Sequence, residues 1–469
     1  MQDTNVVIVG CGFSGLLQGA LLSKTSKVVM IEKNDHIGGL FNTLENNGDY
    51  IYTGAHCIGG ISDRGIWKQC FDILGLKMED YFTEIENIAV SVKGNTYMMP
   101  IKLEALKDKL SEMFPEERKI NDFFELIFQY NKAFLDNDST GLKNMFCKLV
   151  NYTFDEFLSL YFTDELAKIL LLSYIPAYAG IGFAGNAFTA VSLLVTYSIG
   201  TAYTEVNKLI DKLQQLILEN GGEFCCGSTV NRIQKKDEGY LVELKNKKDQ
   251  ICNLSCERIV LSCYPKKIIS DSFPEIKTNA YMNGLHEGPS AIRLVCKISN
   301  NEKDVATEIM SYGSYNYSEI EDNIFFKNGM KHFPICMLSM PTLEQDRKQD
   351  YTYVMFTILT YQCDVDNTVK DDLLEMLKKD MPHLFDRIIE SYVFLPEYYK
   401  SIIGYDSGSV FGWERSRKTN LMTNMFSPQI KDVPGLFLAG QWSSDFGIYG
   451  GVRNALMIYE IERKNNANN

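Results

Sequence analysis

Residues 6–15, with the sequence VVIVGCGFSG, decide the fold of this chain. The apolar, β-branched run 6–9 is typical of a buried parallel strand. Gly10, Gly12 and Gly15 follow at once, and leucine and alanine then recur at helical spacing. These glycines suit a tight turn, a close approach of the backbone to a pyrophosphate, and close packing of a helix on a sheet. The start of that helix offers free N–H groups and the positive end of its dipole to phosphate.

A second apolar run, 27–31, ends in Glu32. An acidic side chain at this point accepts hydrogen bonds from both ribose hydroxyls and repels a 2′-phosphate. It therefore favours FAD or NAD over NADP. Because strand, glycines, helix, second strand and acid occur in this order, the sequence predicts a dinucleotide-binding fold rather than a structural glycine turn.

The stretch 32–39, EKNDHIGG, resembles the extended fingerprint of a clan of flavoproteins, the amine oxidases and phytoene desaturases. Two adjacent glycines, Gly38 and Gly39, let a loop lie flat against a cofactor where a Cβ would clash. In the clan an arginine often follows the glycine pair, whereas Leu40 stands there in this chain. The resemblance implies FAD as the cofactor. From the residues alone, an ordinary Gly-Gly turn is the alternative.

Residues 50–60, YIYTGAHCIGG, are typical of a strand that runs into a glycine-rich loop. The clan commonly has a similar element beside the flavin, which implies that Gly54, Ala55 and His56 lie there. An imidazole can donate and accept a hydrogen bond in one place, so His56 is a candidate to contact the flavin or the substrate. The alternative is a histidine that satisfies loop carbonyls.

Near the C-terminus, residues 435–442, GLFLAGQW, form an apolar run that ends in a glycine and a polar residue, and 447–452, GIYGGV, open a helix. This pair resembles the closing FAD motif of the clan, in which a helix N-terminus points at the flavin. Such a helix end stabilises the negative charge of the reduced ring. Gly450 and Gly451 are expected to permit close approach to the ring. An acidic residue usually follows the strand glycine in the clan, but Gln441 stands there in this chain.

The middle of the chain predicts a helix over 206–217, ended by glycines, and then four extended segments: 223–226, 229–233, 240–244 and 258–262. The residues alone indicate an α/β crossover with a β-meander. The order also resembles the second half of the FAD-binding domain of the clan. That resemblance implies that Val230 lies where the adenine binds.

Two further segments bear on the substrate. Residues 64–135 are expected to be mainly helical, and 169–204 carry no charged residue. One proline and several glycines interrupt the second segment, so buried helices around an apolar chamber are favoured over a membrane span or a membrane-dipping element. Residues 408–414, GSVFGWE, resemble the aromatic-glycine element near the ring in desaturase-like members, which implies that Trp413 lies near the flavin.

The composition excludes some partners. A net charge of −13 argues against nucleic acid or an anionic membrane held by charge. The cysteines lack the spacing of a zinc site, and we interpret them as thiols in a reducing compartment. No basic segment precedes an apolar run at the N-terminus, so a signal peptide is not expected. The predictions are therefore a cytoplasmic protein with no metal, and as an alternative a peripheral contact with a membrane.

Together these features predict an α/β fold: a Rossmann-type (GR2-like) FAD-binding domain with a β-meander, and a discontinuous α+β substrate domain. The first is placed at 1–100, 200–265 and 405–469, and the second at 101–199 and 266–404. The catalytic candidates are His56, Tyr449 and Trp413. The predicted FAD-binding residues are Gly10, Gly12, Phe13, Ser14, Gly15, Glu32, Lys33, Gly38, Gly39, Leu40, Gly54, Ala55, His56, Val230, Gly440, Gln441, Gly450, Gly451 and Val452.

The predicted activity is that of an FAD-dependent oxidoreductase of desaturase, dehydrogenase or oxidase type, which removes a hydride from a largely apolar small molecule. Three alternatives remain open on the sequence alone. They are an amine oxidase, a flavin-dependent isomerase or mutase without net redox change, and a non-catalytic flavin-binding protein. The flavin would carry the chemistry, and the protein would supply position and electrostatics.

Overall fold

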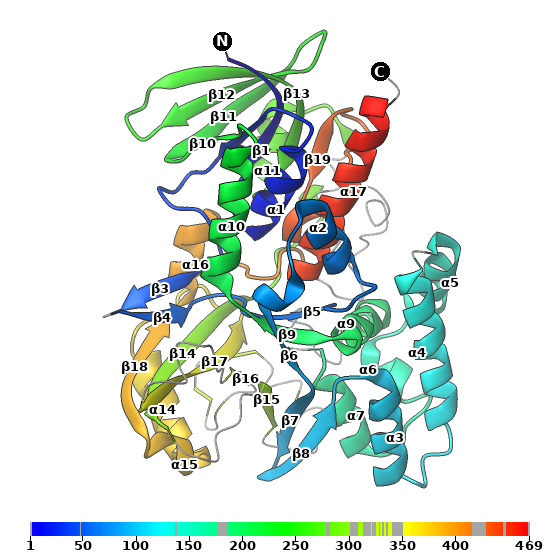
Figure 1. The fold of residues 1–469 in the computed structure, drawn as a ribbon. Helices are drawn as coiled ribbons and strands as arrows, with labels where there is room; N and C mark the ends of the chain where they lie inside the picture. The colour runs from blue at the N-terminus through cyan, green and yellow to red at the C-terminus, as the bar shows by residue number, and fades with distance from the viewer. Residues whose placement is uncertain are drawn as a thin grey trace.

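The computed structural model describes residues 2–46, 48–136, 138–175, 185–277, 282–300, 308–312, 320, 325–327, 329–330, 333, 336–339, 350–414, 428–443 and 447–467. In this part of the chain, strands and helices form two main bodies, one above the other in Figure 1. The N-terminal strand and the C-terminal helix both belong to the upper body. The chain therefore leaves this body and returns to it at its end.

The upper body is built on a sheet with the strand order β10-β2-β1-β13-β12-β11, in which β19 also pairs with β13. Its strands are β1 (Gln2–Val9), β2 (Val28–Ile31), β10 (Glu223–Cys225), β11 (Ser228–Lys235), β12 (Tyr240–Asn246), β13 (Ile251–Leu261) and β19 (Leu436–Leu438). The strands β10, β2, β1, β13 and β19 are parallel, and β11 to β13 form an antiparallel meander. The predicted crossover and meander are confirmed.

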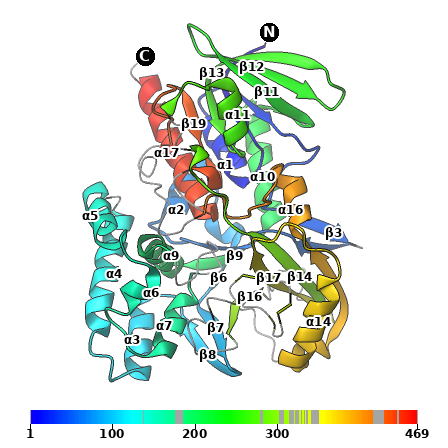
Figure 2. The same ribbon diagram turned by 180° about the vertical axis from the view of Figure 1, so that it is seen from behind.

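Side chains of β1 alternate between two buried faces of this sheet. Val6 and Ile8 pack with α1 (Phe13–Leu22), α10 (Val206–Glu219) and α17 (Gly447–Ala467). Val7 and Val9 pack on the other face, with the meander and α11 (Lys266–Ser272). Figures 1 and 2 show α1, α10 and α17 on one side and α11 on the opposite side. Burial on both faces explains why this strand is apolar throughout.

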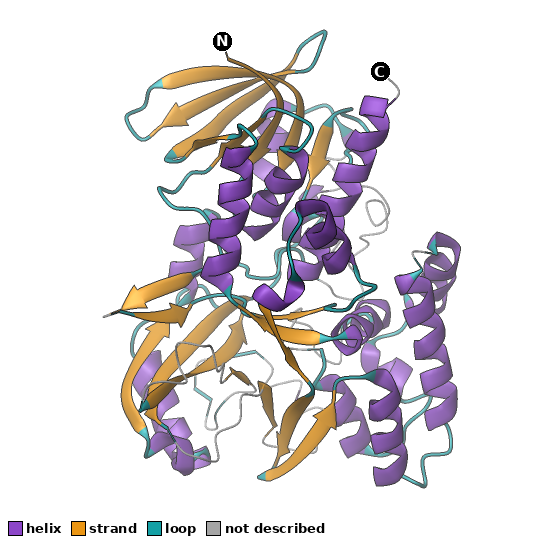
Figure 3. Ribbon diagram, viewed as in Figure 1, coloured by secondary structure: helices purple, strands orange, loops and turns teal. Residues whose placement is uncertain are grey.

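The lower body holds a mixed sheet with the strand order β18-β14-β17-β16-β15-β7-β8, visible with the other strands in Figure 3. Its strands are β7 (Asn87–Val92), β8 (Asn95–Pro100), β14 (Ser290–Ser299), β15 (Glu308–Tyr312), β16 (Cys336–Ser339), β17 (Tyr351–Thr360) and β18 (Ile388–Phe394). Helix α14 (Val369–Asp380) buries Leu373 and Leu377 against β14 and β17, and α15 (Pro382–Phe385) follows it. Helix α16 (Pro396–Ile403) then leads back toward the upper body.

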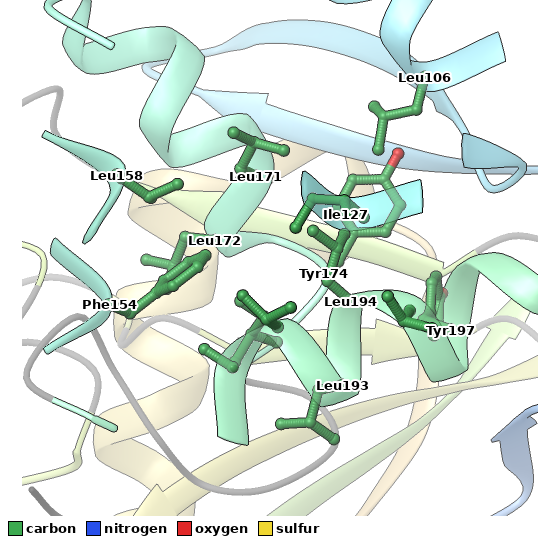
Figure 4. Close-up of a cluster of buried hydrophobic side chains, with 14 of the residues drawn as sticks. Leu106, Ile127, Phe154, Leu158, Leu171, Leu172, Tyr174, Leu193, Leu194 and Tyr197 are labelled. Atoms are coloured by element: carbon green, nitrogen blue, oxygen red, sulfur yellow. The ribbon is translucent and has the colours of Figure 1, made fainter. Parts of the chain in front are cut away.

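A helical layer lies beside this sheet. It comprises α3 (Leu103–Met113), α4 (Ile120–Leu135), α5 (Ser139–Leu149), α6 (Phe154–Leu158), α7 (Glu165–Leu172) and α9 (Ala187–Ile199). Its core is aliphatic and aromatic, with Ile127, Leu171 and Leu194 fully buried; Figure 4 shows this cluster. The aromatic residues of α4 are core residues, as their helical spacing predicts.

Short elements connect the two bodies. They are the hairpin β3 (Thr43–Asn46) and β4 (Asp49–Tyr52), the small sheet β5 (Cys57–Gly59), β9 (Thr201–Thr204) and β6 (Phe82–Ile85), the helix α2 (Ile66–Leu74), and the 3-10 turns η1 (Met78–Asp80) and η4 (Gly440–Trp442). Strand β4 leads directly into the loop that carries His56. The hairpin therefore sets the position of this loop.

Two expectations need correction. The segment 64–135 contains the helices α2, α3 and α4, as expected, but β6, β7 and β8 also lie within it. Lys93 and Gly94 both have positive φ, and they form the tight turn between β7 and β8, a hairpin that the helical interpretation overlooked. The uncharged segment 169–204 contains α7 and α9, as expected, but it ends in strand β9.

Pro176, Gly180 and Gly182 lie outside the described residues. No helix in the described ranges is both long enough and apolar enough to cross a bilayer. The division into two discontinuous domains stays a prediction; β7 and β8, placed in the first domain by the sequence, pair into the lower sheet.

Candidate functional site

A cavity of about 730 Å³ runs between the upper and lower bodies. This volume lies in the range of small-molecule and cofactor sites. Fourteen of the predicted cofactor residues line the cavity: Gly10, Gly12, Phe13, Ser14, Glu32, Lys33, Gly39, Leu40, Gly54, Ala55, His56, Val230, Gly440 and Gln441. The dinucleotide motif, the Gly-Gly loop, the histidine loop and the C-terminal strand therefore meet at one site.

The glycines of the first motif divide into two kinds. A Cβ on Gly15 would lie 2.0 Å from the carbonyl oxygen of Gly10, so this glycine serves close packing and does not line the cavity. A Cβ on Gly12 would meet its nearest protein atom only at 3.9 Å. Gly12 lies at the cavity and precedes α1, a helix with no acidic residue in its first turn and no capping side chain. This arrangement fits a pyrophosphate at the helix N-terminus.

Glu32 lies at the end of β2 and is buried. One carboxylate oxygen accepts from the backbone N–H of Cys11 at 2.8 Å, and the other accepts from that of Asn34 at 2.9 Å. These bonds fix the carboxylate at the cavity wall. Since each oxygen has a second acceptor position, the group fits the ribose hydroxyls of a dinucleotide.

The wall near Glu32 is completed by residues of the meander and of α11. Val230 lines the cavity, as the resemblance implied, together with Ser228, Lys267 and Asp271. Helix α11 packs on β11 and contributes Lys267 and Asp271. Sequence reasoning missed these two, since a short helix after a strand carries no signal for a ligand. This end of the cavity fits the adenosine part of FAD.

His56 lies in the cavity wall at the junction of the two bodies and is 1% exposed. Its Nδ1 lies 3.0 Å from the carbonyl oxygen of Gly54. The ring stacks on Tyr203 and lies against Tyr52. Burial, and then the nearby charge of Arg293, lower the pKa of His56 to about 3. The imidazole is therefore neutral at physiological pH.

Sequence reasoning missed Arg293 and Tyr399, which line the cavity beside His56. Both are buried. Burial raises the pKa of Tyr399 to about 12, so its hydroxyl keeps its hydrogen. Arg293 is the one charged residue in the apolar stretch 290–296, and a cation within a buried strand was the signal that could have found it.

The C-terminal motif lies at the cavity, but the residues that line the cavity come three positions earlier than the predicted Gly450, Gly451 and Val452. Helix α17 begins at Gly447, and Gly447, Ile448 and Tyr449 line the cavity. Gly450, Gly451 and Val452 do not line it, and the same holds for Gly38 in the earlier loop. A Cβ on Gly451 would lie 2.1 Å from the hydroxyl oxygen of Ser14, so this glycine permits close packing of α17 on α1. The first turn of α17 therefore lies nearer the cavity than Gly450 and Gly451, and an approach of these two glycines to a flavin ring stays a prediction.

The other two catalytic candidates differ in their position. Tyr449 lines the cavity, and its ring stacks on Phe134 of α4 at 5.4 Å. Trp413 does not line the cavity. It is buried against Trp442, whose carbonyl oxygen accepts from the indole N–H at 2.9 Å. Trp413 thus packs behind the wall that Trp442 and Phe411 form. Catalytic roles for the three residues stay predictions.

The cavity wall changes character along its length. Beside His56 it is lined mainly by apolar or uncharged side chains, among them Ile58, Leu193 and Val410, and also by the buried cation Arg293. Leu193 and Tyr197, both labelled in Figure 4, belong to α9, so the helical layer supplies part of this wall. Segment 169–204 therefore lies at the cavity through α9, and an apolar substrate chamber stays a prediction.

Comparisons with known proteins agree with this geometry. Residues 8–74 match the family model of an NAD(P)-binding Rossmann-like domain. The chain is 21% identical to all-trans-retinol 13,14-reductase of Rattus norvegicus, over 99% of this chain and 86% of that protein. It is 52% identical to an uncharacterized protein of Methanocaldococcus jannaschii, over 59% of this chain and 60% of that one. The match to the Danio rerio retinol reductase spans only 43% of that protein.

The fold also matches that of putrescine oxidase bound to putrescine, with a TM-score of 0.67 at 14% identity, over 98% of this chain and 99% of that one. The chain is thus similar in sequence to retinol reductases and in fold to a flavin-dependent amine oxidase, both of the clan of FAD-dependent amine oxidases and desaturases. This confirms the resemblance drawn from the motifs and the α/β fold class, and it supports an FAD-dependent oxidoreductase as the type of protein. The glycines, Glu32 and the open space at Gly12 fit FAD as the cofactor.

Proposed function

We propose that this protein transfers a hydride between FAD and a carbon atom of a largely apolar small molecule, in the direction of desaturation or dehydrogenation. The observation that carries the proposal is the mainly apolar wall beside His56, in which Ile58, Leu193 and Val410 line the cavity together with the buried cation Arg293. When bound, the flavin supplies the hydride chemistry. The residues of this chain bind it, orient the substrate and exclude water.

Each part of the wall has a role in this proposal. Gly12 and the N-terminus of α1 hold the pyrophosphate, and Glu32 holds the ribose. Gly447 and the first turn of α17 place a positive helix end at the cavity, where charge develops on reduction. Leu193, Ile58 and the neighbouring apolar side chains hold the substrate and keep water out.

An amine oxidase is less well supported, although a putrescine oxidase has this fold. For an amine oxidase, the resemblance to the clan implies an aromatic pair that faces the flavin and a lysine that holds a water there. Among the described residues that line the cavity, the lysines are Lys33 and Lys267, and both belong to the end formed by Glu32 and α11. The cavity beside His56 instead contains the cation Arg293, which repels a charged amine.

The test is anaerobic mixing of the oxidised, FAD-loaded protein with single compounds, followed by the absorbance of the flavin. The panel contains all-trans-retinol, a set of partly saturated polyenes and long-chain alkenes, and putrescine. We expect at least one apolar compound to bleach the flavin, and putrescine to leave it oxidised. Bleaching by putrescine alone would establish the amine oxidase instead. An isomerised product from pre-reduced protein, with no return of the oxidised flavin bands, would establish an isomerase.

A further inference from the structure

Three successive carbonyl groups of the loop before His56 are bound by side chains from the lower body. Nη1 of Arg293 donates to the carbonyl oxygen of Tyr52 at 3.1 Å and to that of Gly54 at 2.6 Å. The hydroxyl of Tyr399 donates to the carbonyl oxygen of Thr53 at 3.1 Å. Arg293 lies on β14 and Tyr399 on α16, far along the chain from the loop. We call this set of contacts the loop clamp.

The loop is also fixed from its other side. A Cβ on Gly54 would lie 1.5 Å from the carbonyl oxygen of Leu40, so Gly54 packs directly on the Gly-Gly loop. At the start of β4, Asp49 is bound by Lys297 at 3.2 Å and by Tyr353 at 2.8 Å. Both ends of β4 are therefore held by β14, through Lys297 at one end and Arg293 at the other.

The Gly54 carbonyl connects the clamp to the histidine. Its oxygen accepts from Arg293 and also lies 3.0 Å from Nδ1 of His56. A carbonyl oxygen can only accept, so Nδ1 carries the hydrogen in this contact. In a neutral imidazole the other nitrogen, Nε2, is then an acceptor. The position of one backbone oxygen thus selects the tautomer of a side chain in the cavity wall.

We propose that Arg293 is a positioning residue, which fixes the loop 52–56 and, through the Gly54 carbonyl, holds His56 as the tautomer that presents Nε2 as its acceptor. A role in packing alone does not require a cation here, because burial of a guanidinium costs free energy that neutral donors avoid. The functional meaning of this acceptor rests on the proposed function, since it concerns the site where substrate and flavin would meet. The tautomer itself does not depend on turnover.

The test is nuclear magnetic resonance of the FAD-loaded protein labelled with ¹⁵N-histidine, at neutral pH. His56 is assigned by loss of its signals in His56→Gln, among the 5 histidines of the chain. The two ring nitrogens give well-separated signals when a single neutral tautomer is present. We expect a protonated Nδ1 and an unprotonated Nε2 in the wild type. A protonated Nε2 would overturn the proposal.

Variants separate positioning from packing. Arg293→Met keeps the stem of the side chain and removes its donors, and we expect the separation between the two nitrogen signals to be lost as the tautomers exchange. Lys297→Met is the matched control on the same strand, since Lys297 binds Asp49 and not the loop carbonyls. It should leave the His56 signals unchanged. An unchanged His56 pattern in folded Arg293→Met would overturn the proposal.

Two milder variants, Arg293→Lys and Tyr399→Phe, test the proposal if Arg293→Met does not fold. Arg293→Lys keeps the charge but lacks the planar fork of donors, so a partial loss of signal separation is expected. Tyr399→Phe removes only the hydroxyl at Thr53, and should give a smaller loss than Arg293→Lys. Unchanged His56 signals in Arg293→Lys would then count against the proposal. Because no substrate enters these measurements, failure of the proposed hydride transfer and failure of the clamp are told apart.

Discussion

At the scale of single residues, the three glycines of the first motif differ in what surrounds them: some are required by packing and one borders open space. Gly10 has a φ of +99°, and a Cβ there would lie 2.8 Å from the carbonyl oxygen of Ser262. Gly15 is excluded from carrying a side chain by the Gly10 carbonyl. Gly12 has an ordinary φ of −68° and open space beside it. Only Gly12 is therefore explained by a ligand rather than by packing.

This difference predicts opposite outcomes for two alanine variants. Gly12→Ala should leave the free energy of unfolding without FAD within about 0.5 kcal/mol of wild type, but weaken FAD binding by tenfold or more, about 1.4 kcal/mol. Gly15→Ala should destabilise the protein whether or not FAD is present, because the clash is with backbone. Urea unfolding of the FAD-free protein and FAD titration of each variant check this. Unchanged FAD affinity in Gly12→Ala would contradict the placement of the pyrophosphate.

The buried histidine predicts a pH dependence of stability. His56 has an ordinary pKa of 6.5, which burial and then Arg293 lower to about 3 in the folded protein. Between these values the unfolded chain binds a proton that the folded protein does not, so stability falls as the pH falls from 6.5 toward 3. The loss at pH 5 is about 2 kcal/mol relative to pH 8.

Urea unfolding at pH 8 and pH 5 measures this loss. His56→Gln should remove most of it, whereas His383→Gln, on the exposed side of α15, should not. Equal pH dependence in the wild type and in His56→Gln would show that another group carries the effect.

At the scale of elements, α9 separates a core from a cavity. Leu194 is fully buried in the helical layer, and Leu193, the next residue, lines the cavity. Leu194→Ala is expected to cost about 2–5 kcal/mol, the usual range for a buried leucine. Leu193→Ala should cost less and should change the dissociation constant of an apolar probe severalfold. Urea unfolding and retinol fluorescence give the two quantities. A larger change in retinol binding for Leu194→Ala than for Leu193→Ala would place the substrate wall elsewhere.

Elements also show which parts of the fold were predictable from sequence. The strands β1 and β2, the meander and the start of α1 could be predicted, because a strand buried on both faces and a glycine turn leave a strong local pattern. The hairpin β7–β8 was missed, since its turn at Lys93 and Gly94 was not recognised. Helix α17 was predicted, but its first turn lies three residues earlier at the cavity than the glycine pair suggested.

At the scale of the whole molecule, the site is an interface between two bodies, and its two halves differ in how much the sequence revealed. The half formed by Glu32 and the glycines belongs to local motifs. Arg293, Tyr399 and Leu193 come from segments far apart in the sequence, and they meet only when the lower sheet and the helical layer close on the upper body. Pairing between distant segments leaves no periodic signal. The sequence could therefore mark Arg293 as a cation in a buried strand and Leu193 as part of an apolar segment, but it could not show that they meet Tyr399 at one cavity.

The most direct test of the central claim, that this cavity binds FAD, is the absorbance spectrum of the purified protein, followed by anaerobic reduction with dithionite and titration of any FAD-free fraction with FAD. We predict a yellow protein whose flavin bands bleach on reduction. We also predict that added FAD raises the stability by about 2.7 kcal/mol at a hundredfold excess over its dissociation constant. A colourless protein that takes up no added FAD and gains no stability from it would contradict the account.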